Sequence, residues 1–118
     1  MKKYQLIVVG GGPGGYTAAF RAAELGMSVA IVDDNDLGGV CLNWGCIPTK
    51  SLLKNAEVFE LINNANSYGI EVGKPKIHFE KIINKTIQAR NRLSKGLLFQ
   101  VRKLGVDFFP GFATFIDK

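Results

Sequence analysis

The fold is decided by a short apolar run followed by glycines, Tyr4-Gln5-Leu6-Ile7-Val8-Val9-Gly10-Gly11-Gly12-Pro13-Gly14-Gly15. Residues 4–9 are rich in Leu, Ile and Val, as in a strand that is buried in a parallel sheet. The glycines satisfy the pattern G-x-G-x-x-G through Gly10, Gly12 and Gly15. Small residues then predict a helix over 16–25, which Gly26 can end in a left-handed conformation. A second strand is predicted over 28–32.

This order of strand, glycine turn, helix and strand is the context that a dinucleotide-binding unit requires. The glycines of such a unit allow a tight turn, a close approach of the pyrophosphate and close helix–strand packing, and the helix N-terminus binds the phosphates. An acid at the end of the second strand accepts hydrogen bonds from the ribose, and Asp33 is favoured over Asp34. The pattern alone does not distinguish FAD from NAD. The residues expected to bind the dinucleotide here are Gly10, Gly12, Pro13, Gly14, Gly15, Asp33 and Asp34.

Both cysteines of the chain lie in a second motif, Gly38-Gly39-Val40-Cys41-Leu42-Asn43-Trp44-Gly45-Cys46-Ile47-Pro48-Thr49-Lys50. In a regular helix, residues i and i+5 are about 7.5 Å apart along the axis and lie on different faces. A disulfide needs Cα atoms roughly 4.4–6.8 Å apart. Either the two thiols do not meet, or the helix is distorted between them. Gly45 gives the backbone freedom for a distortion, and Pro48 can start a fresh helix.

A redox-active pair describes these two thiols better than a structural disulfide. A disulfide at a strained junction between loop and helix is easily reduced, and a helix N-terminus lowers the pKa of a thiol. Two other interpretations remain open. The cysteines could be half of a zinc site, but a closed site needs four ligands and His78 is the only further ligand of that type in the sequence. They could also be two inert buried thiols.

The composition fits one α/β globular domain of 118 residues, 47% of them hydrophobic and 21% charged. The net charge of +5 comes largely from residues 74–103, where a solvated helix face is favoured over nucleic-acid binding. No apolar run approaches the roughly 20 residues of a membrane span, and the start has no signal-peptide pattern. Two closely spaced cysteines fit a reducing cytoplasm and a catalytic use.

The two motifs, in this order, resemble those of the flavoprotein disulfide reductases. The resemblance covers the whole chain, which would match the first quarter or so of such an enzyme. The residues around the cysteines look most like the dihydrolipoamide dehydrogenase branch, through Val40, Leu42, Asn43, Ile47, Pro48 and Thr49. Glutathione and mercuric reductases share the cysteine pattern. Many relatives carry Thr where Val40 stands, so a hydroxyl contact at that position is not assumed.

The resemblance implies a role for each matching residue. Cys46 would be the thiol next to the flavin, and Cys41 would be the interchange thiol that exchanges with the substrate. Asp33 would bind the adenosine ribose of FAD. Lys50 lies one turn after Cys46 on the same helix face and would stabilise negative charge on the reduced flavin. The other positions expected at the cofactor are Gly38, Gly39, Val40, Cys41, Gly111 and Ala113, and no metal is expected.

The remaining residues predict two more helical segments and a third strand. The helix of the cysteines continues over 51–63, and a long helix over 79–104 carries an apolar stripe typical of core or domain packing. Residues 106–116 predict a third parallel strand, a sharp turn and the start of another strand. His78 is expected to be a surface or turn residue. The predicted fold class is therefore α/β, a Rossmann-like FAD-binding domain with a parallel sheet and helices on both faces.

The resemblance also implies a larger enzyme. Residues 1–118 are expected to be the N-terminal part of an FAD-binding domain, truncated within it, without the NAD and dimer-interface domains of the family. The whole enzyme is expected to be a cytoplasmic homodimer, without nucleic-acid or membrane contact. Through a Cys41–Cys46 disulfide it would oxidise dihydrolipoamide, borne on lipoyl domains of 2-oxo acid dehydrogenase complexes, with NAD.

These residues alone are expected to bind FAD weakly and to have no turnover. The alternatives are a sibling enzyme similar to glutathione or mercuric reductase, and a non-catalytic flavin-binding fragment.

Overall fold

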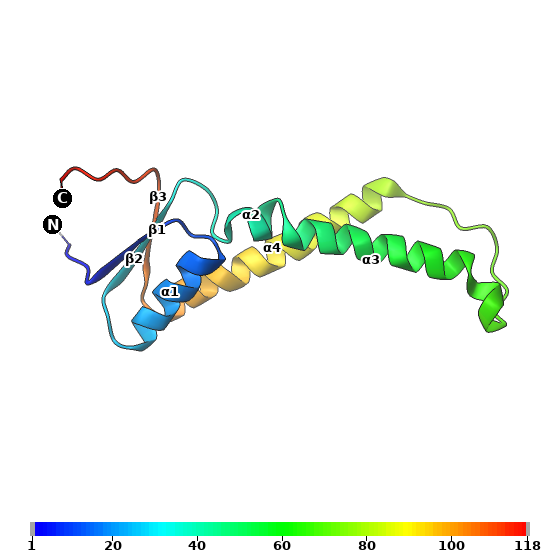
Figure 1. The fold of residues 1–118 in the computed structure, drawn as a ribbon, viewed down its shortest axis with the longest axis horizontal. Coiled ribbons are helices and arrows are strands. Elements are labelled where there is room, and N and C mark those ends of the chain that lie inside the picture. The colour runs from blue at the N-terminus through cyan, green and yellow to red at the C-terminus, as the bar shows by residue number, and fades with distance from the viewer. Residues whose placement is uncertain (1, 118) are drawn as a thin grey trace.

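The computed structural model describes residues 2–117, which form a small sheet and a long helical hairpin (Figure 1). The elements in chain order are β1 (Leu6–Val9), α1 (Pro13–Glu24), β2 (Val29–Asp33), α2 (Gly39–Asn43), α3 (Cys46–Asn63), the 3₁₀ helix η1 (Ala65–Tyr68), α4 (Phe79–Lys103) and β3 (Asp107–Pro110). The molecule measures 67 × 26 × 20 Å because the α3–α4 hairpin extends away from the sheet. Within residues 2–117, no helix is both long and apolar enough to cross a membrane.

The sheet is parallel and its strands lie in the order β1-β2-β3. Leu6 pairs with Val29 in the first ladder, and Ile31 pairs with Phe108 in the second. The three predicted strands and the α/β fold with a parallel sheet are therefore confirmed. The predicted start of a fourth strand is not found, because residues 111–117 have no regular structure and Phe115 is 93% exposed.

One hydrophobic core lies between the sheet and the two helices that connect its strands. Its buried members come from α1, β2, the loop before α2, the end of α4 and the turn into β3: Ala19, Ala22, Val29, Ile31, Leu37, Val101 and Val106. Alanines on α1 have little side chain, so this helix packs closely on the strands. The same core contains partly buried residues of β1 and α4, so both connecting helices cover one face of the sheet.

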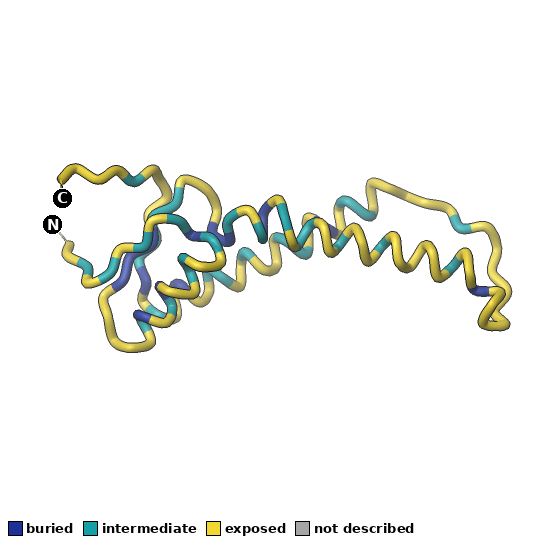
Figure 2. Tube along the Cα trace, viewed as in Figure 1, coloured by how far each residue is buried: buried dark blue, intermediate teal, exposed yellow. Residues whose placement is uncertain are grey.

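The prediction of helices on both faces is not met within residues 2–117. Ile7 and Val9 point away from the core and are 55% and 56% exposed, and Phe109 is exposed as well. Figure 2 shows the buried stretches mainly around the sheet and α1, whereas the α3–α4 hairpin is mostly exposed or intermediate. The physical reason is the handedness of the connections. Parallel β-α-β crossovers are right-handed, so two crossovers that advance in the same direction place both helices on the same side.

The helix that carries the cysteines is broken, as the spacing of the two thiols suggested. The helix α2 ends at Asn43, and α3 begins at Cys46 after Gly45, whose φ is −118° and ψ −107°. A Cβ at Gly45 would lie 3.0 Å from the carbonyl oxygen of Val40, so a side chain would crowd the break. Pro48 does not start the helix but lies in its first turn, where a missing N–H leaves no intrahelical bond unmade.

The glycine loop requires the absence of a side chain most strictly at Gly15. A Cβ there would lie 1.9 Å from the carbonyl oxygen of Gly10 and 3.2 Å from the Cγ1 of Val8. This is the close approach of the first helix to the first strand that the fingerprint predicts. At Gly14, one residue earlier, no atom lies within 4 Å of the position of a Cβ.

We expect Gly15→Ala to lower the free energy of unfolding of this chain by about 2–3 kcal/mol, because the methyl group would displace backbone. The matched control is Gly14→Ala, which is expected to raise it by roughly 0.5–1 kcal/mol, since alanine is a better helix former. Urea unfolding followed by circular dichroism measures both changes. Equal effects at the two positions would contradict the close packing described here.

Candidate functional site

The two sequence motifs meet through their backbones. The N–H of Gly38 donates a hydrogen bond of 2.9 Å to the carbonyl oxygen of Gly11. A Cβ at Gly39 would lie 2.8 Å from the Cα of Gly12, and Gly39 has a φ of 57°. The cysteine segment therefore starts directly on the glycine loop, and glycine is required where these two segments of the chain touch.

The carboxylate of Asp33 also belongs to this junction. Its Oδ2 accepts a hydrogen bond of 2.5 Å from the N–H of Gly11, and its Oδ1 accepts one of 2.8 Å from the N–H of Asn35. Asp34 is exposed, and its Oδ1 accepts a bond from the side-chain amide of Asn35. Asp33 thus holds the glycine loop in place, and its role as the ribose acceptor stays a prediction.

A cavity of about 210 Å³ lies at the carboxyl ends of the strands. It brings together five residues predicted at the cofactor, namely Gly10, Asp33, Asp34, Gly111 and Ala113. The N–H of Gly111 donates a hydrogen bond of 2.8 Å to the carbonyl oxygen of Asp33, so the end of β3 lies next to the end of β2. An acid and an open backbone beside one cavity suit the adenosine end of FAD.

The start of α1 has the features of a phosphate-binding helix N-terminus. The helix begins at Pro13, and Gly12 before it makes no capping hydrogen bond through a side chain. Positions Gly10 and Gly14 have open space where a Cβ would stand. Unpaired N–H groups and the positive end of the helix dipole favour an anion, so this loop fits the pyrophosphate of FAD.

Cys41 and Cys46 are free thiols in this structure, the first half-buried and the second exposed. The disulfide between them stays a prediction. Interaction with the Cys46 thiol, followed by partial desolvation, raises the pKa of Cys41, although the Cys46 N–H and Lys50 act in the opposite direction. The expected lowering of a thiol pKa by a helix N-terminus is therefore not found at Cys41, because the neighbouring thiol has the larger effect.

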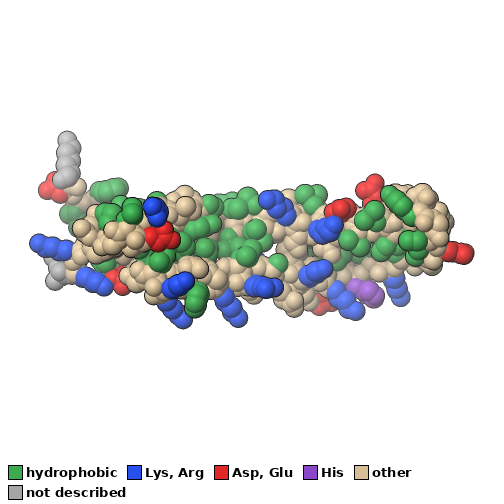
Figure 3. Space-filling model, turned by 90° about the horizontal axis from the view of Figure 1, so that it is seen from below, with side chains coloured by type: hydrophobic (Ala, Val, Ile, Leu, Met, Phe, Trp, Pro, Cys, Tyr) green, Lys and Arg blue, Asp and Glu red, His purple; other side chains and the backbone are tan. Residues whose placement is uncertain are grey.

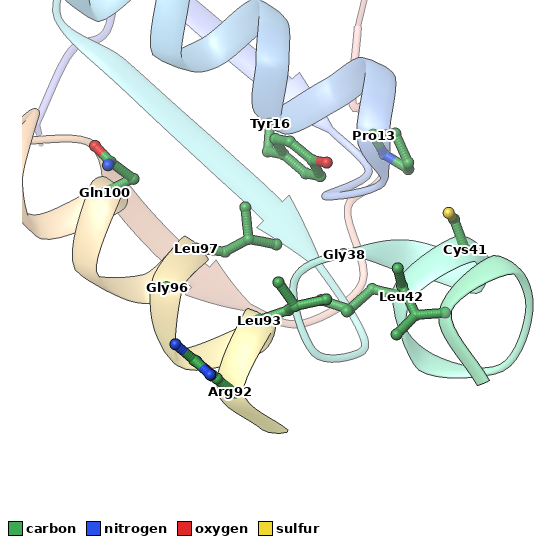
Figure 4. A pocket seen from close by; sticks show the side chains of 11 residues that line it. Pro13, Tyr16, Gly38, Cys41, Leu42, Arg92, Leu93, Gly96, Leu97 and Gln100 are labelled. Atoms are coloured by element: carbon green, nitrogen blue, oxygen red, sulfur yellow. The ribbon is translucent and has the colours of Figure 1, made fainter. Parts of the chain in front are cut away.

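Cys41 lines a cavity of about 520 Å³, which lies between α1, α2 and α4. Its lining is mostly apolar. Figure 4 shows the ring of Tyr16 and the side chain of Leu97 facing each other across it, with Leu93 and Leu42 beside them. Cys46 does not line this cavity. A thiol at the edge of an apolar cavity can react with a sulfur compound that has an apolar body.

Pro13 and Gly38, which are predicted to contact the cofactor, also line this cavity, whereas Lys50 and Val40 do not. Lys50 is exposed and, with Lys54 and Lys85, borders a separate hollow of about 330 Å³ between α3 and α4. Val40 is exposed and lines none of the cavities described above. Within residues 2–117, no group of three or more His, Cys, Asp or Glu side chains is placed to hold a metal ion.

Sequence reasoning missed several residues of the site. The long helix α4 was interpreted as packing surface, but Leu93, Gly96 and Leu97 line the cavity of Cys41. Gly96, a glycine inside a long helix, was the available signal, and a Cβ at this position would meet no atom within 4 Å. Asn43 was used only for the resemblance, yet its side chain is buried and donates to the carbonyl oxygens of Asp36 and Gly39.

The comparison with known proteins agrees with this geometry. Residues 4–118 match the pyridine nucleotide-disulphide oxidoreductase family. The chain belongs to this family. Its members are FAD-dependent disulfide oxidoreductases, as the two motifs predicted.

Three relatives are each named dihydrolipoyl dehydrogenase. The chain is 50% identical over 108 residues to that of Zymomonas mobilis, 43% over 112 residues to that of Acholeplasma laidlawii, and 37% over 114 residues to one of Bacillus subtilis. These matches cover 92%, 94% and 97% of the chain but 23%, 33% and 24% of the relatives. The chain thus spans between about a quarter and a third of their length and corresponds to an N-terminal FAD-domain portion.

We expect Cys46→Ala to lower the pKa of Cys41, because the substitution removes the interaction that raises it most. The thiolate fraction at a given pH then increases, so alkylation of Cys41 by iodoacetamide should reach its half-maximal rate at a lower pH. Cys46→Ser is the matched control, since its hydroxyl retains a hydrogen-bonding partner. Identical pH profiles in the alanine variant and the wild type would contradict this cause.

Proposed function

We propose that residues 1–118 are the N-terminal part of the FAD-binding domain of a dihydrolipoamide dehydrogenase, with Cys41 as the interchange thiol and Cys46 as the thiol next to the flavin. One observation carries the proposal. Of the two neighbouring thiols, only Cys41 opens on the large apolar cavity, while the segment that holds both begins on the predicted cofactor loop. The two thiols therefore have different surroundings, as an asymmetric redox pair requires.

The exchange follows from this asymmetry. In the oxidised pair, one thiolate of the dithiol substrate attacks the Sγ of Cys41, which forms a mixed disulfide and breaks the bond to Cys46. Cys46 leaves as a thiolate with the electron pair. The second substrate thiolate then attacks the first substrate sulfur, closes the cyclic disulfide and releases Cys41. The substrate loses two electrons and two protons. The electrons reduce the protein disulfide, one proton ends on the Cys41 sulfur, and the other passes to solvent because Cys46 leaves as a thiolate.

The chain's own residues fix where the protons and charges go. The raised pKa of Cys41 favours a proton on that sulfur after its release.

Lys50, four residues after Cys46 on α3, places a cation on the same side of the helix. When FAD is bound, it supplies the acceptor for the electron pair of the Cys46 thiolate, and NAD is the proposed final acceptor. The other proposed cofactor contacts are Gly10, Gly12, Pro13, Gly14, Gly15, Asp33, Asp34, Gly38, Gly39, Val40, Gly111 and Ala113.

Two features support a lipoyl substrate. The cavity walls near Cys41 are the aliphatic and aromatic side chains of Tyr16, Leu42, Leu93 and Leu97, which suit the hydrocarbon chain that bears a lipoyl dithiol. The relatives described above carry the name dihydrolipoyl dehydrogenase. We propose in addition that the complete enzyme is a cytoplasmic homodimer and serves lipoyl domains of 2-oxo acid dehydrogenase complexes.

The test is turnover by the full-length enzyme with dihydrolipoamide, glutathione disulfide and mercuric ion in parallel. We expect NAD reduction with dihydrolipoamide, and a loss of more than about 1,000-fold in Cys41→Ser and Cys46→Ser, since a hydroxyl cannot replace either sulfur in the exchange. Cys41→Ser should still bind FAD. Preference for glutathione or mercuric ion would replace the proposed substrate, and normal turnover without either sulfur would refute the mechanism.

A further inference from the structure

Asn43 is the last residue of α2 and lies between the two cysteines in the sequence, and its side chain is buried and bonded to backbone. Only 6% of the residue is exposed, and among residues 2–117 only Thr86 is also a buried polar residue. The Nδ2 of Asn43 donates hydrogen bonds to the carbonyl oxygens of Asp36, over 3.1 Å, and Gly39, over 3.0 Å. One amide group therefore joins the loop before α2 to the first residue of α2.

The helix α2 needs such external support. It has five residues, and an isolated helix of this length is unstable because nucleation fixes several residues for very few hydrogen bonds. Its start is held on the glycine loop by the bond from Gly38 to Gly11. Its end is followed by the break at Gly45, so it gains no continuation into α3. Asn43 provides the second attachment point.

We propose that Asn43 is a positioning residue for the thiol exchange. Its amide fixes α2 so that the Sγ of Cys41 is held both toward Cys46 and at the edge of the apolar cavity. This inference rests on the proposed function, because it concerns the exchange between Cys41 and a dithiol substrate. Asn43 does not line the cavity, and its side-chain amide donates to backbone carbonyl oxygens, so its role is positioning and not catalytic.

The amide matters because the two sulfurs move relative to each other in every cycle. They are about 2.05 Å apart when bonded and separate when the bond opens. With α2 attached at both ends, this movement is confined to the side chain of Cys41. Without the amide, the carbonyl oxygens of Asp36 and Gly39 lose this donor and the turn carrying Cys41 can shift. A misplacement of about 1 Å costs a reaction up to about 100-fold in rate.

The experiment uses the full-length, FAD-loaded enzyme with Asn43→Leu, which keeps the approximate size without a donor, and Asn43→Asp, which turns a negative group toward the two carbonyl oxygens. Asn84→Asp, on the exposed face of α4, is the matched control for the change of charge. Stopped-flow absorbance measures two half-reactions separately. One is the reduction of the enzyme by dihydrolipoamide, and the other is the initial bleaching of the flavin by NADH.

We expect both Asn43 variants to slow reduction by dihydrolipoamide about 10- to 100-fold. Flavin bleaching by NADH should change by less than about twofold, because it precedes any exchange at Cys41. Asn84→Asp should match the wild type in both half-reactions. A wild-type rate with dihydrolipoamide in Asn43→Leu would overturn the proposal, and so would an equal loss in both half-reactions, which indicates general damage.

Two further results keep the test decisive. If neither variant accumulates as a flavoprotein, Asn43→Ser, which retains one hydroxyl donor, takes their place with the same criteria. If the wild-type enzyme itself does not oxidise dihydrolipoamide, the proposed function fails, whereas a wild type that turns over together with an equally active Asn43→Leu refutes only the positioning role.

Discussion

The contact on which the site depends is between two backbones. Gly38 donates to the carbonyl oxygen of Gly11, and Gly39 approaches Gly12 so closely that a Cβ on Gly39 would lie 2.8 Å from the Cα of Gly12. The cysteine segment thereby lies closer to the glycine loop than a side chain on Gly39 would allow. The position of the cysteine segment relative to the glycine loop is thus fixed by this contact, because closely packed backbone leaves little freedom of movement.

The second constraint is the break in the helix between the thiols. A continuous helix would place residues 41 and 46 on different faces, and the interruption at Trp44 and Gly45 allows both to approach. The break leaves α2 as an isolated turn, and the structure compensates with hydrogen bonds from outside the helix, at Gly38 and Asn43. The geometry needed for the redox pair and the burial of a polar amide are two consequences of one local distortion.

The sequence predicted the elements well where a pattern had a local cause. The glycine fingerprint, the strands around it and the long amphipathic helix were all recognisable, because sheet burial, tight turns and helical periodicity appear directly in residue order. The arrangement of helices relative to the sheet was not recognisable in the same way. Whether α1 and α4 share a face depends on the order of the strands, and the bond from Gly11 to Asp33 depends on tertiary contact. Neither property has a signature within a short window of sequence.

The thiol pair shows why a local rule can predict the wrong direction for a pKa shift. A helix N-terminus favours a thiolate, and the N–H of Cys46 does act in that direction on Cys41. A second thiol within reach opposes it more strongly, because a neighbouring sulfur shares its proton and repels a second negative charge. The direction of the Cys41 shift is therefore set by the neighbouring side chain and not by the helix end. In the proposed exchange, this raised pKa favours a proton on Cys41 once its sulfur has been released.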